Sequence, residues 1–248
     1  MHYFTLTVAY DGTKYYGWQK QKNVPSIAAT LEDTFFKTFH KPVSLKGASR
    51  TDAGVHALGQ LVGVIIDFAI EADSLKQAWN FALPPDIVIR SITAHNEKIN
   101  IFNTVDYKIY YYHFFVNRPL PFVQQYGWFV KQPLDKEKLI AALQVFKGTH
   151  DFRSFCSSED ERECMVRTID QIDLDYCKRF GVYRIKVVGA AFLRHMIRRI
   201  VGACITVAAR DSAPVSLLQK VLAEKNPEQT LPNAPAKGLL LYKIITKK

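Results

Sequence analysis

The sequence predicts an α+β protein (mixed α/β) built from two halves, each with strand-helix-strand order. Three observations predict this fold class. Short alternating or β-branched runs recur along the chain, stretches with helical apolar spacing separate them, and the strands alternate as hairpin strands do. Sheets of such strands are more often antiparallel or mixed than parallel. The 248 residues suffice for one large domain or two of ordinary size.

The first half has the order strand, helix, strand, helix, strand. The opening strand alternates apolar and polar residues and turns at Asp11-Gly12. Residues 26–40 predict a helix because Ser26 is a good N-cap and apolar side chains recur every four residues behind it. The further elements of this half are a strand at 60–68, a helix at 73–83 that two prolines stop, and a strand at 86–95.

The second half repeats the alternation of strands and helices. The predicted elements are an aromatic strand at 107–117, a helix at 135–152 ending near Gly148, strands at 167–177 and 181–192, helices at 193–209 and 216–224, and a strand at 236–246. The junction falls near residues 100–106. We therefore expect two domains, 1–104 and 105–248.

The charge of the chain favours a polyanionic partner. The net charge is +10 and the pI is near 9.4. Residues 176–210 contain no Asp or Glu, while the stretch before them, 157–163, is strongly acidic. This basic segment is either a solvated helix face or a phosphate-binding surface, and the overall charge favours the second. Its basic residues are Lys178, Arg179, Arg184, Lys186, Arg194, Arg198, Arg199 and Arg210.

Several classes of protein are disfavoured. The four cysteines, Cys156, Cys164, Cys177 and Cys204, form no C-x-x-C pair and fit neither a zinc ribbon nor a disulfide framework. We expect buried or idle thiols. No apolar run reaches transmembrane length, and the N-terminus lacks a basic leader with a cleavage site. The expected location is the cytoplasm, with no membrane partner.

The most informative stretch is Arg50 to His56, at the entry to an apolar strand. It brings an arginine, Asp52 and a histidine together within seven residues. Asp52 is either an Asx-turn residue or a functional carboxylate, which a nearby guanidinium would keep ionised. Asp52 and His56 alone are a weak metal signal because no third ligand is visible nearby.

Two further segments could carry chemistry. Tyr110, Tyr111 and Tyr112 place hydroxyls on both faces of a strand, which is either core or a platform for stacking a base and moving a proton. The helix at 193–209 has one apolar face, and its arginines project elsewhere. They are solvated, or they bring Arg198 to a carboxylate and its neighbours to phosphates.

The stretch "GASRTDAGVHALGQ" closely resembles the signature of the tRNA pseudouridine synthase A family. "VAYDGTKYYGWQKQ", "FALPPDIVI", "GTHDFRSFC", "RTID", "FLRHMIRRIVG" and "APAKGLLL" are similar to further family segments and occur in family order. The resemblance implies the pseudouridine synthase fold, in which two α/β halves with antiparallel sheets join around a central RNA-binding cleft.

The resemblance also implies a reaction. Enzymes of this family detach uracil from its ribose in RNA, rotate it and rejoin it through C5, without cofactor or metal. Carried over, Asp52 is the nucleophile, Arg198 pairs with it, Tyr110 stacks on the base and helps remove the C5 proton, and Leu239 packs against the uracil. The expected substrate contacts further include Arg50, His56 and Arg199.

Two positions depart from the family pattern. Lys108 and the spacing that follows favour Tyr110 as the active-site tyrosine, whereas counting back from Asn117 favours Tyr111. We choose Tyr110. In addition, Arg199 stands where the family usually has Asn, and it either adds an RNA contact or extends a basic face.

The resemblance implies a homodimer that acts on the anticodon stem-loop of tRNA, at positions 38, 39 or 40. Two alternatives remain open at this point. The first is a non-catalytic RNA-binding protein that retains the fold. The second is a metal-dependent nucleic-acid hydrolase that uses Asp52 and His56.

Overall fold

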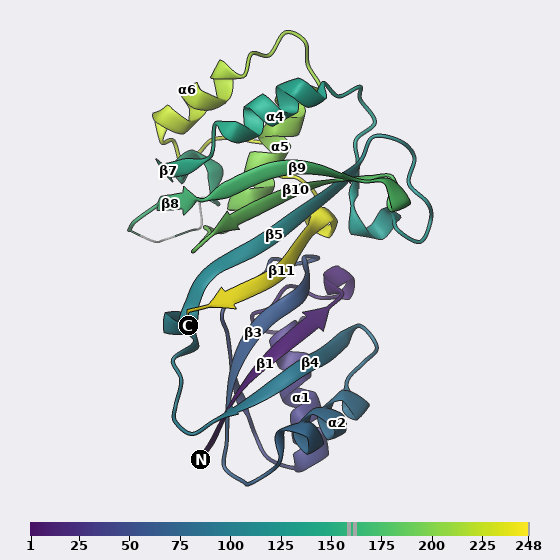
Figure 1. Ribbon diagram of the computed structural model, residues 1–248, viewed down its shortest axis with the longest axis vertical. Coiled ribbons are helices and arrows are strands. Elements are labelled where there is room, and N and C mark those ends of the chain that lie inside the picture. The colour runs from purple at the N-terminus through teal and green to yellow at the C-terminus, as the bar shows by residue number, and fades with distance from the viewer. Residues whose placement is uncertain (158–159, 161–162, 248) are drawn as a thin grey trace. The chain divides into compact units, whose positions relative to one another are not determined.

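The computed structural model describes residues 1–157, 160 and 163–247, so most of the predicted acidic stretch 157–163 lies outside the described residues. The chain folds into two compact units (Figure 1). The first unit comprises Met1–Asp106 and Leu240–Lys248, and the second comprises Tyr107–Leu239. Helices and largely antiparallel sheets alternate in both, which confirms the predicted α+β class.

A mixed sheet forms the first unit. Its strands are β1 (His2–Tyr10), β2 (Ser44–Gly47), β3 (His56–Ile66), β4 (Ile87–His95) and β11 (Leu239–Thr246). Strand β1 pairs antiparallel with β3 and β4, and β2 pairs antiparallel with β3. The last strand, β11, pairs in parallel with the start of β3.

Two helices, α1 (Ile27–Phe39) and α2 (Ala72–Ala82), lie on one face of this sheet (Figure 1). Helix α1 begins where predicted, because the Ser26 side chain accepts a hydrogen bond from the Ala29 N–H. Its apolar stripe is buried, and the Trp79 indole of α2 donates to the Leu31 carbonyl at 3.2 Å. A short helix, α3 (Ile101–Thr104), and a 3-10 turn, η1 (Gly12–Lys14), complete the unit.

An antiparallel sheet of β5 (Val105–Phe115), β10 (Val182–Gly189) and β9 (Gln171–Cys177) forms most of the second unit. Strand β6 (Trp128–Phe129) adds to β5, and β7 (Gly148–Asp151) pairs with β8 (Val166–Ile169) in a separate sheet. Helices α4 (Lys136–Gln144) and α5 (Met196–Ala208) cover one face of β9 and β10, with α6 (Ser216–Glu224) beyond them (Figure 1). The 3-10 turns are η2 (Gln124–Tyr126), η3 (Arg153–Phe155), η4 (Lys178–Phe180) and η5 (Ala236–Gly238).

Some predicted boundaries were wrong. The helix predicted at 135–152 ends at Gln144, and residues from Gly148 onward form β7, because Gly148 adopts φ 100°, which a helix cannot accommodate. The strand predicted at 167–177 is two strands that break at Asp170 and pair with different partners. Helix α5 begins at Met196 rather than 193, preceded by His195 at φ 62°.

The two-domain division at residues 104 and 105 stays a prediction. Measured by packing, the chain passes into the second unit near Tyr107 and returns to the first at Leu240. The return has a simple cause, since Leu240 and Leu241 pair with His56 and Ala57 of β3.

Candidate active site

Asp52 begins a four-residue turn directly before β3. The Val55 N–H donates to the Asp52 carbonyl at 3.1 Å, and Gly54 has φ 75°, the positive value that the third position of a type II turn requires. This β-turn is closed through the main-chain carbonyl of Asp52, so closing it does not engage the carboxylate. The Asx turn that the sequence offered as an alternative would be closed by the carboxylate, and it stays a prediction. The Asp52 residue as a whole is half-buried.

The loop formed by residues 11–18 is hydrogen-bonded to this turn on both sides of Asp52. On one side, the Trp18 N–H donates to the Thr51 carbonyl at 3.1 Å, and the Thr51 hydroxyl lies 2.8 Å from the Tyr10 hydroxyl. On the other side, the Gly54 N–H donates to the Tyr15 carbonyl at 3.1 Å. Because Thr51, just before Asp52, and Gly54, two residues after it, are tied to one loop, the backbone of Asp52 has little freedom to shift.

Two glycines of loop 11–18 make this close approach possible. A Cβ on Gly12 would lie 2.0 Å from the Val55 carbonyl oxygen, and a Cβ on Gly17 would lie 2.4 Å from the Thr51 carbonyl oxygen. Gly17 also has φ 89°, which disfavours any other residue. The sequence predicts the turn at Gly12, but the contribution of Tyr15 and Gly17 to the site was missed. Both residues lie in the family-like segment "VAYDGTKYYGWQKQ", which is the signal that the sequence offered.

His56 opens β3 and is buried, with 5% of its surface exposed. Its Nδ1 lies 3.0 Å from Asp11 Oδ1 and 3.1 Å from the Gly12 nitrogen. The ring nitrogen thus faces loop 11–18. Arg50, in contrast, is exposed two residues before Asp52, where it can reach a ligand.

The tyrosine run of β5 is divided between the two faces of the second sheet. Tyr110 and Tyr112 point to the buried face, and the Tyr112 hydroxyl donates to the Pro235 carbonyl at 2.9 Å. Burial raises the pKa of the Tyr112 phenol, and the positive charge of Arg198 opposes that rise. Arg198 bonds to Ala234, the residue next to Pro235, so the two side chains meet the same short segment. Tyr111 is on the opposite face, with the Arg184 guanidinium 4.4 Å from its ring centre.

Arg198 is held by the segment formed by residues 229–239. Its Nε donates to the Ala234 carbonyl at 2.8 Å, and the Ala234 N–H donates back to the Arg198 carbonyl at 3.1 Å. The same segment ends at Leu239, which is buried, and a Cβ on Gly238 would lie 2.6 Å from the Tyr112 ring. Within the second unit, Arg198 and Tyr112 therefore both contact the segment that ends at Leu239.

The basic segment 176–210 is not uniformly solvated. Arg184 forms an ion pair with Asp175 at 2.9 Å. Arg199 is half-buried, and its Nη1 donates to the Gln229 carbonyl at 3.4 Å. Arg194 is exposed. The segment thus mixes anchored and accessible cations, and its binding of phosphates stays a prediction.

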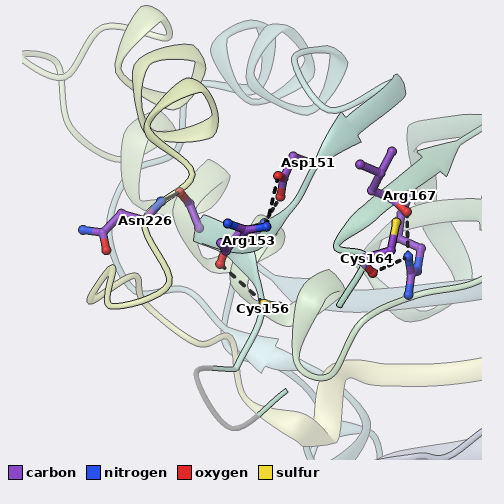
Figure 2. Close-up of polar contacts among 8 residues, drawn as sticks. Asp151, Arg153, Cys156, Cys164, Arg167 and Asn226 are labelled. Carbon is purple, nitrogen blue, oxygen red and sulfur yellow. Dashed lines mark hydrogen bonds and ion pairs between the residues drawn. The ribbon is translucent and has the colours of Figure 1, made fainter. Parts of the chain in front are cut away.

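The cysteines vary in environment. Cys156 and Cys204 are buried, and burial raises the pKa of the Cys204 thiol. Figure 2 shows the Cys156 thiol, which donates to the Arg153 carbonyl at 3.4 Å, and Cys164, whose carbonyl accepts from Arg167. In the part of the chain that the structure describes, no three His, Cys, Asp or Glu side chains are grouped to hold a metal ion. No helix in that part is long and apolar enough to cross a membrane.

Comparison with known proteins identifies the family. Residues 6–102 and 142–245 match the family model described as tRNA pseudouridine synthase. The matched residues include Asp52, Arg198 and Leu239, whereas the tyrosine strand β5 lies between the two matched ranges.

Curated relatives extend the match over nearly the whole chain. The tRNA pseudouridine synthase A of Thermodesulfovibrio yellowstonii is 33% identical, covering 97% of this chain and 98% of that protein. The enzyme of the same name from Thermosipho africanus is 36% identical, with 99% and 100% covered. That of Pseudothermotoga lettingae is 35% identical, with 98% and 99% covered. The chain therefore belongs to the tRNA pseudouridine synthase family of isomerases.

Proposed function

We propose that this enzyme converts uridine to pseudouridine in the anticodon stem-loop of tRNA, at positions 38, 39 or 40, with Asp52 as the nucleophile. One observation carries the proposal. Asp52 lies on a turn that loop 11–18 holds from both sides, through Thr51 and Gly54. Such rigidity is what a nucleophile needs to meet a flipped nucleotide in a fixed geometry.

The proposed reaction is an isomerisation that needs no cofactor. The bond between the ribose and uracil N1 breaks, the base turns, and the ribose is rejoined to uracil C5, which loses its proton while N1 gains one. Asp52 attacks the nucleotide as an anion. Tyr110 stacks on the extruded base and assists loss of the C5 proton, and Leu239 packs against the uracil.

Arg198 is the proposed partner of the Asp52 carboxylate. A guanidinium next to a carboxylate favours the ionised form that attack requires. The bond from Arg198 Nε to the Ala234 carbonyl supports this role, because it fixes the plane of the guanidinium. Tyr110 is preferred to Tyr111 because it shares the face of Tyr112, beside Arg198, while Tyr111 stacks with Arg184 on the other face.

The proposed RNA contacts combine position and charge. Arg50 is exposed beside the Asp52 turn, where it can contact the RNA backbone or support base extrusion. Arg199 is a proposed phosphate contact in the basic segment, and the net charge of +10 favours a polyanion overall. We further propose that the enzyme is a cytoplasmic homodimer.

The test is to incubate the protein with unmodified tRNA transcripts and map pseudouridine by position. The expected product is pseudouridine at position 38, 39 or 40, and none with Asp52→Asn. A non-catalytic RNA-binding protein would bind the transcripts without converting them. A metal-dependent hydrolase would cleave the transcripts, and a chelator would inhibit that cleavage. Appreciable turnover by Asp52→Asn would remove Asp52 from the role of nucleophile.

A further inference from the structure

The imidazole of His56 is buried where the Asp52 turn becomes strand β3. Its Nδ1 faces two groups of loop 11–18, Asp11 Oδ1 at 3.0 Å and the Gly12 nitrogen at 3.1 Å. The same Asp11 oxygen accepts hydrogen bonds from the N–H and the hydroxyl of Thr13, so this carboxylate is itself held in place. His56 is therefore packed against loop 11–18 through one specific ring nitrogen.

The two contacts of Nδ1 belong to the protonated and the unprotonated form of that nitrogen. An imidazole nitrogen donates when it is protonated and accepts when it is not. Protonated Nδ1 donates to Asp11 Oδ1, whereas unprotonated Nδ1 accepts from the Gly12 N–H. Both bonds lead to the same dipeptide, so the ring stays attached to loop 11–18 in either state.

This attachment reaches Asp52 through a short and rigid path. Gly12 approaches the Val55 carbonyl so closely that a Cβ on it would lie 2.0 Å from the oxygen. The Val55 N–H in turn closes the turn on the Asp52 carbonyl. A shift of Gly12 must therefore move Val55 and the turn, while the backbone of His56 is fixed by its pairing with Leu240 of β11.

We infer that His56 and Asp11 are positioning residues, which hold the Asp52 turn in register with loop 11–18 and act without touching the RNA. The inference rests on the proposed role of Asp52. It differs from the expectation that His56 binds substrate, because the nitrogen that makes the contacts is Nδ1 and its partners belong to the protein. A displaced carboxylate is costly, since about 1 Å of misplacement can lower a rate by ~10²-fold.

Two substitutions of His56 separate these roles by the position of the polar atom. Asn places its amide near the location of Nδ1, whereas Gln places its amide near the location of Nε2. A positioning role through Nδ1 predicts that His56→Asn keeps kcat within about threefold of the wild type, while His56→Gln lowers kcat by ~10²-fold and changes the KM for tRNA little. His95→Gln is the matched control, because His95 bonds to Thr5 elsewhere in the first unit.

The opposite order overturns the inference: if His56→Gln is as active as the wild type, or more active than His56→Asn, the ring does not act through Nδ1. A raised KM with unchanged kcat in His56→Gln also overturns it, in favour of a contact with substrate. Asp11→Ala provides a second test that does not depend on the folding of His56→Gln. It should lower kcat, though by less than His56→Gln, because the Gly12 N–H still meets Nδ1, and full activity of Asp11→Ala contradicts the inference.

Asp52→Asn is measured in the same series, so that failure of the proposed nucleophile can be told apart from failure of the positioning role. An active Asp52→Asn protein removes the proposed nucleophile. Equal kcat values for the Asn and Gln variants of His56, together with an inactive Asp52→Asn protein, remove only the positioning role.

Discussion

Arg198 and Ala234 are joined by two hydrogen bonds that run in opposite directions. The Arg198 Nε donates to the Ala234 carbonyl at 2.8 Å, and the Ala234 N–H donates to the Arg198 carbonyl at 3.1 Å. A residue bonded through both its backbone and its side chain to one partner cannot swing its guanidinium without breaking a bond. The pair thus orients Arg198 before any substrate is bound, which is the arrangement that electrostatic stabilisation requires.

Replacement of Arg198 by Lys should lower kcat strongly, by ~10²-fold or more, with a modest loss of tRNA affinity. The ammonium of Lys retains the charge but cannot donate to the Ala234 carbonyl and present a planar pair of donors to a carboxylate at once. Single-turnover kinetics and tRNA binding measure the two effects. Arg210→Lys, at an exposed position two residues beyond the end of the same helix, is the control. A fully active Arg198→Lys protein would show that pairing with Asp52 is dispensable.

The choice between Tyr110 and Tyr111 can be decided with Phe. Tyr110→Phe keeps a ring for stacking but removes the hydroxyl that we propose assists proton loss from C5, so kcat should fall by ~10² to 10⁴-fold while binding persists. Tyr111→Phe keeps its stacking with Arg184 and should retain most of its activity. Pseudouridine formation under saturating tRNA is the measurement. The reverse ranking of the two variants would assign the active-site role to Tyr111.

The elements of this fold could be predicted where local spacing determines them. Helix α1 follows from a good N-cap and an apolar side chain every fourth residue, and the structure places Ser26 and the buried stripe as expected. The helix predicted at 135–152 was extended too far, because apolar spacing carries no information about backbone dihedral angles. The positive φ of 100° at Gly148, where strand β7 begins, cannot be read from that spacing.

The site was predictable as a set of residue types but not as an arrangement. The sequence predicts a turn at Asp11-Gly12 and a polar cluster around Asp52 as separate features. Their contact depends on backbone hydrogen bonds between residues far apart in the chain, such as Trp18 to Thr51. Periodicity reports which side of an element is buried and carries no information about which loops meet. The bonds between Arg198 and Ala234 were missed for the same reason.

Gly17→Ala should destabilise the protein by about 1–3 kcal/mol and lower kcat, because φ 89° is strained for Ala and its Cβ would lie 2.4 Å from the Thr51 carbonyl oxygen. Urea unfolding and pseudouridine formation measure both effects. Gly63→Ala is the matched control, since the nearest atom to its Cβ is an Ile101 methyl at an ordinary 3.5 Å. If Gly17→Ala and Gly63→Ala have the same free energy of unfolding and the same kcat, the tight approach of loop 11–18 to the turn is unimportant.

Arg199→Asn should weaken tRNA binding and make its salt dependence shallower. Each phosphate neutralised releases counterions, so the log-log slope of affinity against salt changes by roughly 0.7 to 0.9 for each phosphate that the protein no longer neutralises. Arg199 uses Nη1 for the Gln229 carbonyl and its Nε is buried, so Nη2 is the group by which it would reach a phosphate. Replacement by Asn should therefore reduce the slope by up to about one unit.

The position of the modified uridine should not change in Arg199→Asn, because phosphate contacts position an RNA without reading its sequence. Arg184→Gln is the control within the same basic segment. The Arg184 guanidinium is already engaged in an ion pair with Asp175 at 2.9 Å. Replacing Arg184 should therefore leave the slope of affinity against salt nearly unchanged. Affinities of the three proteins across a salt series, together with their unfolding temperatures, separate two roles. A lowered unfolding temperature with an unchanged slope would make Arg199 an anchor for the segment at Gln229 and remove it from the RNA-binding surface.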